Sequence, residues 1–204
     1  MEQMTLNIPV LALRGLTVFP DQTTGFDVER EISMLALNNA MEEGKDIFLV
    51  TQRELAVARP EESDLYAVGT VAHVLQIIKT SDSTVRVVVR GMSKGRIKRL
   101  WQTHPFLQAN VVLLEDDLPV RMTSRVEAVM RQTYLLFGEY RDMVPELSDE
   151  IVATVLDCDD PGKLADYIGY TINLRHMDCQ RILEEMHPVK RLKLVNERLT
   201  HELE

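Results

Sequence analysis

The apolar residues of this chain change their spacing at residues 115–119 (EDDLP), and this change constrains the fold more than any other feature. Before this segment, apolar and polar residues tend to alternate, which is typical of β-strands. After the segment, apolar residues recur at helical spacing, as in the stripe Val126, Val129, Met130, Thr133, Phe137 and Tyr140. We therefore expect an α+β chain, with a strand-rich lobe over residues 1–117 and an all-helical bundle lobe over residues 118–204.

The strand-rich part predicts a small barrel or coiled sheet with one embedded helix. The helix is expected over residues 30–43, with Ile32, Leu35 and Ala36 on its apolar face and Gly44 as a stop signal. Closely spaced strands with a single helix favour this architecture over a parallel α/β domain. Strands are expected over residues 6–13, 47–50, 68–79, 84–90, 96–101 and 106–114, with a turn at 81–83.

The second part begins with a helix for which Ser124 and Glu127 predict a capping box. Asp160 followed by Pro161 is a second helix-start signal. The last predicted helix keeps its apolar period up to Glu204, without a stop signal. It is therefore expected to be a truncated helix of a longer protein, the alternative being an ordinary frayed terminus. Further helices are expected over residues 149–156, 161–172, 178–186 and 189–204.

Charge and composition exclude several classes of protein. The net charge of −9 argues against a general polyanion binder, so nucleic acid is not an expected partner. Residues 79–99 contain seven basic residues and one acid, and RNA binding by this stretch remains an alternative to a solvated strand face. The sequence has neither a membrane-length apolar run nor a secretory signal, and we expect a cytoplasmic chain in which Cys158 and Cys179 are free thiols.

A search for reactive sites predicts no catalytic, cofactor-binding or metal-binding residue. Residues 91–95 (GMSKG) match the nucleophile pattern G-x-S-x-G, but a strand-like segment follows them where that site needs a helix. A calcium loop starting at Asp157 would need a carboxylate where Ile168 stands. The phosphate-binding pattern G-x-x-x-x-G-K-[ST] is absent, and the histidines lack metal-ligand spacing. The chain is therefore expected to act by binding.

A hydrophobic binding surface is expected where apolar residues interrupt turn-rich segments. Such a surface would suit unfolded polypeptides, which offer apolar side chains without a fixed shape. The alternative is that these residues pack the core of the barrel. The candidates are Leu16, Val18, Phe19, Phe26, Leu65 and Tyr66.

Five segments, taken in their order along the chain, resemble those of one protein family: 8–20 (IPVLALRGLTVFP), 68–72 (VGTVA), 87–97 (VVVRGMSKGRI), 160–166 (DPGKLAD) and 182–192 (ILEEMHPVKRL). Together they resemble the amino-terminal domain of Lon, the ATP-dependent protease. Ser83, Lys94 and Gly95 depart from the residues usual in that family.

The resemblance implies a PUA-like barrel followed by a helical lobe, without the ATPase and serine–lysine peptidase modules of the whole protease. ATP and magnesium would then be cofactors of the ATPase module alone. It also implies that the chain recognises unfolded or tagged protein substrates and supports a homo-hexamer. A stand-alone adaptor or scaffold of the same domain type is the alternative.

Overall fold

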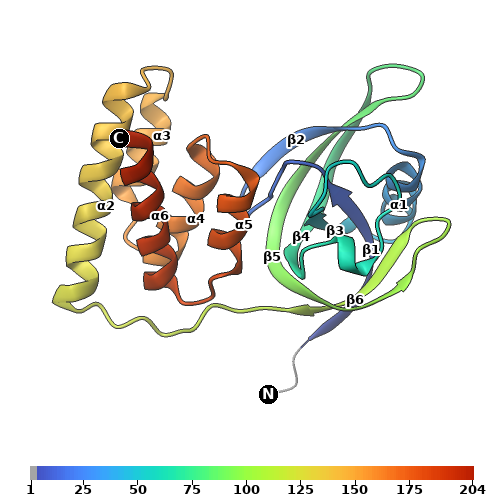
Figure 1. Cartoon of the computed structure of the whole chain (residues 1–204), viewed down its shortest axis with the longest axis horizontal. Helices are drawn as coiled ribbons and strands as arrows, with labels where there is room; N and C mark the ends of the chain where they lie inside the picture. The colour runs from blue at the N-terminus through green and yellow to red at the C-terminus, as the bar shows by residue number, and fades with distance from the viewer. Residues whose placement is uncertain (1–3) are drawn as a thin grey trace. The chain divides into compact units, whose positions relative to one another are not determined.

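The computed structural model describes residues 4–204, and the chain divides into two compact units, Met1–Glu115 and Asp116–Glu204 (Figure 1). The division falls two residues before the boundary expected from the sequence. Asp116 and Asp117 belong to the second unit because their hydrogen-bond partners are residues of that unit. The Asp116 carboxylate accepts hydrogen bonds of 2.7 Å from Arg191, and the backbone N–H of Asp117 donates to the Met186 carbonyl at 3.0 Å.

The first unit is a six-stranded mixed sheet that closes on itself. The strand order is β2-β5-β4-β3-β1-β6, and an additional pairing of β5 with β6 completes a barrel. β1 and β3 are parallel, and the other pairs are antiparallel. The strands are β1 (Thr5–Leu13), β2 (Thr23–Val28), β3 (Asp46–Thr51), β4 (Val68–Lys79), β5 (Val85–Gln102) and β6 (Leu107–Leu113).

The strand β5 is continuous where the sequence predicted two strands separated by glycines. Its first half pairs with β2, its last half pairs with β6, and β4 pairs with residues 85–96. Gly91 and Gly95 lie where other residues approach β5 closely, because a Cβ atom would meet the Phe19 carbonyl at Gly91 and the Val111 side chain at Gly95. The strand β2 was not predicted.

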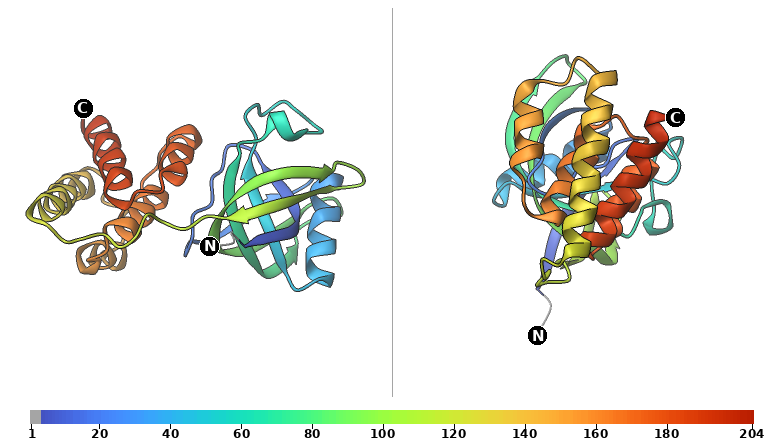
Figure 2. Two further views of the ribbon diagram at one scale, coloured as in Figure 1. Left: turned by 90° about the horizontal axis from the view of Figure 1, so that it is seen from below. Right: turned by 90° about the vertical axis from the view of Figure 1, so that its left-hand side faces the viewer.

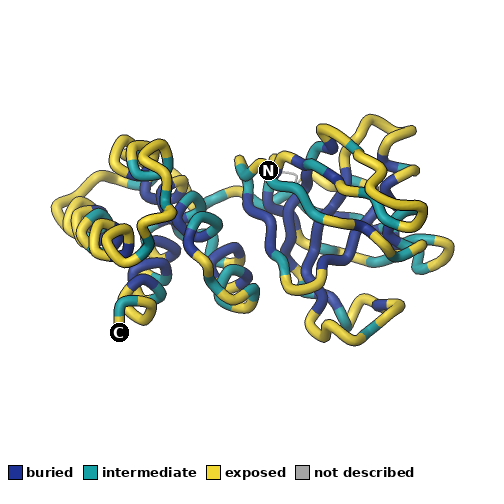
Figure 3. The backbone as a smooth tube through the Cα atoms, turned by 90° about the horizontal axis from the view of Figure 1, so that it is seen from above, coloured by how far each residue is buried: buried dark blue, intermediate teal, exposed yellow. Residues whose placement is uncertain are grey.

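Both faces of the central strands are buried, which explains why their sequences are continuously apolar. In β1, Val10 packs in one core cluster, whereas the next residue, Leu11, packs in the other. In β3, Phe48 and Leu49 divide in the same way. Most residues of β1 and β3 are accordingly buried, and Figure 3 shows dark blue runs along strands of this unit.

The helix α1 (Glu31–Glu42) packs against β1, β3 and β6 (Figure 2). Its buried face consists of Ser33, Ala36, Leu37 and Ala40. Of the predicted face, Ala36 is buried, whereas Ile32 and Leu35 are half-exposed at one edge. The helix ends beside Gly44, whose φ of +107° suits a residue without a Cβ.

The second unit is a helical bundle in which α6 packs against both α2 and α4. Thr123, Ser148 and Asp160 cap α2, α3 and α4, each accepting a hydrogen bond from a first-turn N–H. The predicted capping box is therefore wrong, because Ser124 is already the first helical residue. The helices are α2 (Ser124–Met143), α3 (Asp149–Asp157), α4 (Pro161–Thr171), α5 (His176–Glu184) and α6 (Pro188–Leu203).

Candidate functional site

Two adjoining pockets open on the first unit around the start of α1. The smaller has a volume of about 200 Å³, and the end of β1, the end of β2 and the first turn of α1 surround it. The larger, of about 520 Å³, shares Arg14 and Arg30 with it, so the two adjoin. We call them together the α1 groove. Its apolar walls are formed by Leu11, Leu13, Leu16, Phe26, Ile32 and Leu35.

Arg30 lies between the two pockets and is held by neutral acceptors. Its guanidinium donates to the Gln52 side-chain oxygen and to the Ala12 carbonyl, both at 2.6 Å. Gln52 is fully buried, and its amide donates to the carbonyls of Glu54 and Val57 at 3.2 and 3.0 Å. This chain of bonds fixes the position of the guanidinium.

Arg14 places a second guanidinium in the α1 groove, directly before the turn at Gly15, which has a φ of +66°. It donates to the Val57 carbonyl at 3.0 Å. Burial, followed by the like charge of Arg14, lowers the pKa of Arg30 to about 10. Two positive charges therefore repel one another across the site where the pockets meet.

The larger pocket carries more basic than acidic side chains. Arg14, Arg30, Arg59 and His104 line it, and Glu31 is the acid among its lining residues. The smaller pocket is also lined by two acids, Asp27 and Glu29. Of these, Asp27 is paired with Arg86 at 3.2 Å.

The structure separates the six residues of the predicted binding surface into three groups. Leu16 and Phe26 line the α1 groove. Tyr66 is half-buried, with the Arg53 guanidinium 4.6 Å from its ring centroid. The remaining three were wrongly assigned to the surface, because they pack in the core with exposed fractions of 2%, 0% and 3%: Val18, Phe19 and Leu65.

The basic residues of the groove were missed as site residues. Arg14, Arg30 and Arg59 are far apart in the sequence and form no motif. A turn at Gly15 and an arginine at the start of a predicted helix were the available signals. Neither shows that three loops bring these side chains to one groove.

The geometry of the remaining candidates does not support catalysis. Ser93 lies inside β5, opposite Val71 of β4, and not on a strand-to-helix turn. Burial raises the pKa of the Cys179 thiol to about 11 and also raises that of Cys158, which disfavours the reactive thiolates. Across residues 4–204 there is no group of three or more His, Cys, Asp or Glu side chains that could hold a metal ion.

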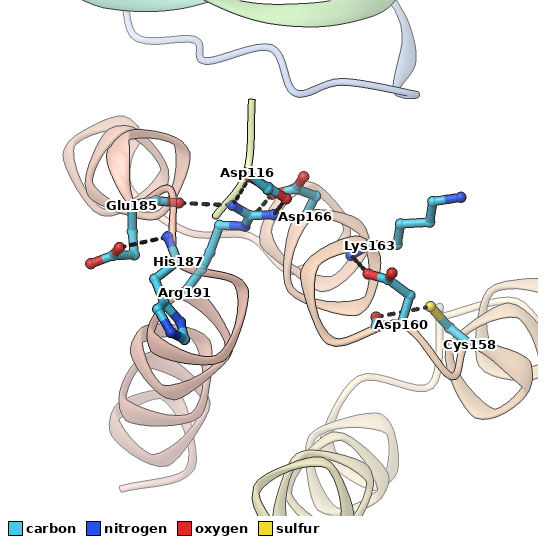
Figure 4. A network of polar contacts seen from close by, with 8 residues as sticks. All are labelled: Asp116, Cys158, Asp160, Lys163, Asp166, Glu185, His187 and Arg191. Atoms are coloured by element: carbon cyan, nitrogen blue, oxygen red, sulfur yellow. Dashed lines mark hydrogen bonds and ion pairs between the residues drawn. The ribbon is translucent and has the colours of Figure 1, made fainter. Parts of the chain in front are cut away.

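The second unit contains a buried polar network centred on Arg191 (Figure 4). Arg191 is fully buried and makes two bonds of 2.7 Å to Asp116, one of 2.8 Å to the Glu185 carbonyl, and an ion pair of 3.0 Å with Asp166. Burial alone would lower the pKa of Arg191, but Asp116 and Asp166 raise it, so the side chain stays charged. Gly162 fits closely here, since a Cβ would lie 2.9 Å from the guanidinium.

This network explains two of the segments that stood out in the sequence. In the segment 160–166, Asp160 caps α4, Leu164 is fully buried, and Asp166 pairs with Arg191. In the segment 182–192, Arg191 is the central residue. Their role in this chain is therefore to build the bundle. No helix in the described part of the chain is long and apolar enough to cross a membrane.

Comparison with known proteins identifies the family. Residues 7–201 match the family described as the ATP-dependent protease La (LON) substrate-binding domain. The chain is 38% identical over 200 residues to a Lon protease of Clostridioides difficile (strain 630), and 35% identical over 202 residues to one of Brevibacillus choshinensis. These matches cover 97% of this chain but 25% and 26% of the relatives, so the chain spans about a quarter of their length.

Two solved structures share the fold. The amino-terminal domain of Mycobacterium avium complex Lon protease aligns with a TM-score of 0.76 and 19% identity, covering 96% of this chain and 98% of that one. A Lon N-terminal domain protein from Xanthomonas campestris aligns with a TM-score of 0.66 and 14% identity, covering 98% and 99%. With the sequence match over 7–201, they show that the chain belongs to the substrate-binding, amino-terminal domain family of Lon proteases.

Proposed function

We propose that this chain is the part of an ATP-dependent Lon-type serine protease that engages misfolded, damaged and selected regulatory proteins. The α1 groove is the observation that carries the proposal, because it presents partly exposed apolar side chains, Leu16 and Phe26, beside hydrogen-bonding groups. Apolar pockets with a few polar groups suit side chains of a disordered polypeptide.

The rest of the proposal follows from the family. The protease would work in the cytoplasm as a homo-hexamer, and this domain would support its assembly. Binding by this chain would require neither ATP nor magnesium, which would serve a separate ATPase module. The purified chain is expected to bind unfolded protein while showing neither ATPase nor peptidase activity.

Replacing Leu16 with glutamine is expected to weaken the binding of an unfolded polypeptide by about tenfold, because one apolar contact of the groove is lost. Fluorescence anisotropy with a labelled, permanently unfolded polypeptide measures the change. Leu75→Gln is the matched control, since Leu75 is 50% exposed on β4 and does not line the groove. Equal weakening by the two variants would contradict binding at the groove.

A further inference from the structure

We infer that the α1 groove selects unfolded segments in which an apolar residue is followed directly by an acidic one. The inference rests on the proposed function and specifies the class of substrate. The apolar side chain would enter the smaller pocket, beside Leu16 and Phe26, and the carboxylate would meet the guanidinium groups of the larger pocket.

The groove has the two chemical environments that such a segment needs, next to each other. Leu11, Leu13, Leu16 and Phe26 line the smaller pocket, and its volume of about 200 Å³ suits one large side chain. Arg14 and Arg30 line both pockets, so they stand where a segment passes from the smaller pocket into the larger one. Neighbouring residues of one segment therefore suffice to occupy both environments.

Acids line the groove, but none of the described residues forms an ion pair with Arg14 or Arg30 at the junction. The hydrogen bonds of Arg14 and Arg30 go to neutral oxygens, those of Val57, Gln52 and Ala12. Burial and then the like charge of Arg14 lower the pKa of Arg30. A carboxylate between the two guanidinium groups would relieve this repulsion and accept charge-assisted hydrogen bonds.

The acids around the groove limit how much negative charge it accepts. Glu29 and Glu31 are exposed at its edges, and they would repel a chain of phosphates or a long acidic run. The overall charge of −9 acts in the same direction. The charge distribution therefore favours a single carboxylate with apolar neighbours over a nucleic acid.

The decisive experiment compares two peptides that differ in one group. Both are fluorescently labelled and capped at each end, and a Leu-Leu-Glu or a Leu-Leu-Gln sequence is placed in a neutral Ser/Gly background. The Glu peptide is expected to bind the parent chain about tenfold more tightly, the effect of a charge-assisted hydrogen bond. The preference should decrease as salt is added, because the interacting groups are partly exposed to solvent.

Variants assign this preference to the groove. Arg14→Gln combined with Arg59→Gln should abolish the preference for the Glu peptide. Both side chains are exposed, so the fold is expected to persist. Arg96→Gln combined with Lys98→Gln makes the same change of charge on exposed positions of β5 outside the groove and should leave the preference intact. Circular dichroism of both variants confirms that they are folded.

The outcomes separate the inference from the proposed function. If the parent binds the Glu and Gln peptides equally, or if the Arg96/Lys98 variant loses the preference, the inference is overturned. The proposed function survives both results as long as the parent still binds a long unfolded polypeptide. If the parent binds no unfolded polypeptide at all, the proposed function fails.

Discussion

Replacing Arg191 with methionine is expected to lower the free energy of unfolding of the second unit by about 3–5 kcal/mol. Methionine replaces the aliphatic part of the arginine side chain but has no guanidinium, so the carboxylates of Asp116 and Asp166 would lose their partner. The exposed fractions of these two side chains are 25% and 13%, and water therefore compensates the loss only in part. The Glu185 carbonyl would lose a donor at the same time.

Chemical denaturation followed by circular dichroism at a helical wavelength measures this effect. Arg141→Met is the matched control, because Arg141 makes one exposed ion pair of 2.9 Å with Asp149. Exposed pairs contribute about 0–1 kcal/mol, so the control should change stability little. Adding Asp116→Asn to Arg191→Met should recover part of the loss, since it removes one unpaired charge. An Arg191→Met variant as stable as the control would show that the network contributes nothing to the bundle.

Replacing Gly91 with alanine is expected to destabilise the barrel by about 3 kcal/mol, toward the upper end of the range for overpacking. The new Cβ would meet the backbone carbonyl of Phe19, which lacks the freedom of a flexible side chain to move aside. The backbone of Gly91 also bonds to the 19–22 turn from both its groups, accepting from Asp21 at 2.9 Å and donating to Gln22 at 2.8 Å. Displacing the strand would therefore break these bonds as well.

The single tryptophan of the chain, Trp101, provides a specific probe for this variant, because it lies on β5 within the first unit. The unfolding transition seen by its fluorescence should shift in Gly91→Ala. Gly138→Ala is the control, since a Cβ at this position in α2 would meet nothing within 4 Å. Alanine there should stabilise the helix by about 0.5–1 kcal/mol. If Gly91→Ala unfolded at the same denaturant concentration as the parent by tryptophan fluorescence, the close approach of Gly91 to the Phe19 carbonyl would be refuted.

Sequence patterns predicted the elements whose burial is periodic and missed those shaped by contacts distant in sequence. The apolar stripe of α2 and the Asp160–Pro161 start of α4 are local signals, and both helices form where these signals placed them. The strand β2 has no such signal, because only one of its six residues is buried and it is held by pairing with β5. Gly91 and Gly95 resembled strand breaks because the sequence does not reveal which neighbours approach their backbones.

The candidate site was predictable in part for a similar reason. Hydrophobicity selected Leu16 and Phe26, which line the groove, but it selected Phe19 and Leu65 equally, and these complete the core. Exposure depends on which strand covers which side chain, and a linear pattern does not contain that information. The arginines of the groove are brought together by three separate loops, so their shared charge exists only in the folded chain.

The closure of the barrel by its last strand also affects the order of folding during synthesis. Since β6 pairs with both β1 and β5, the ring of strands is incomplete until residue 113 has left the ribosome. Until then, β1 and the second half of β5 each present an unpaired edge, which is prone to association with other chains. The helices of the second unit form from near neighbours, yet Asp116 must wait for Arg191, 75 residues later. Each unit is thus completed only by a strand or residue in its C-terminal part. Until that part is synthesised, the unit is prone to association with other chains.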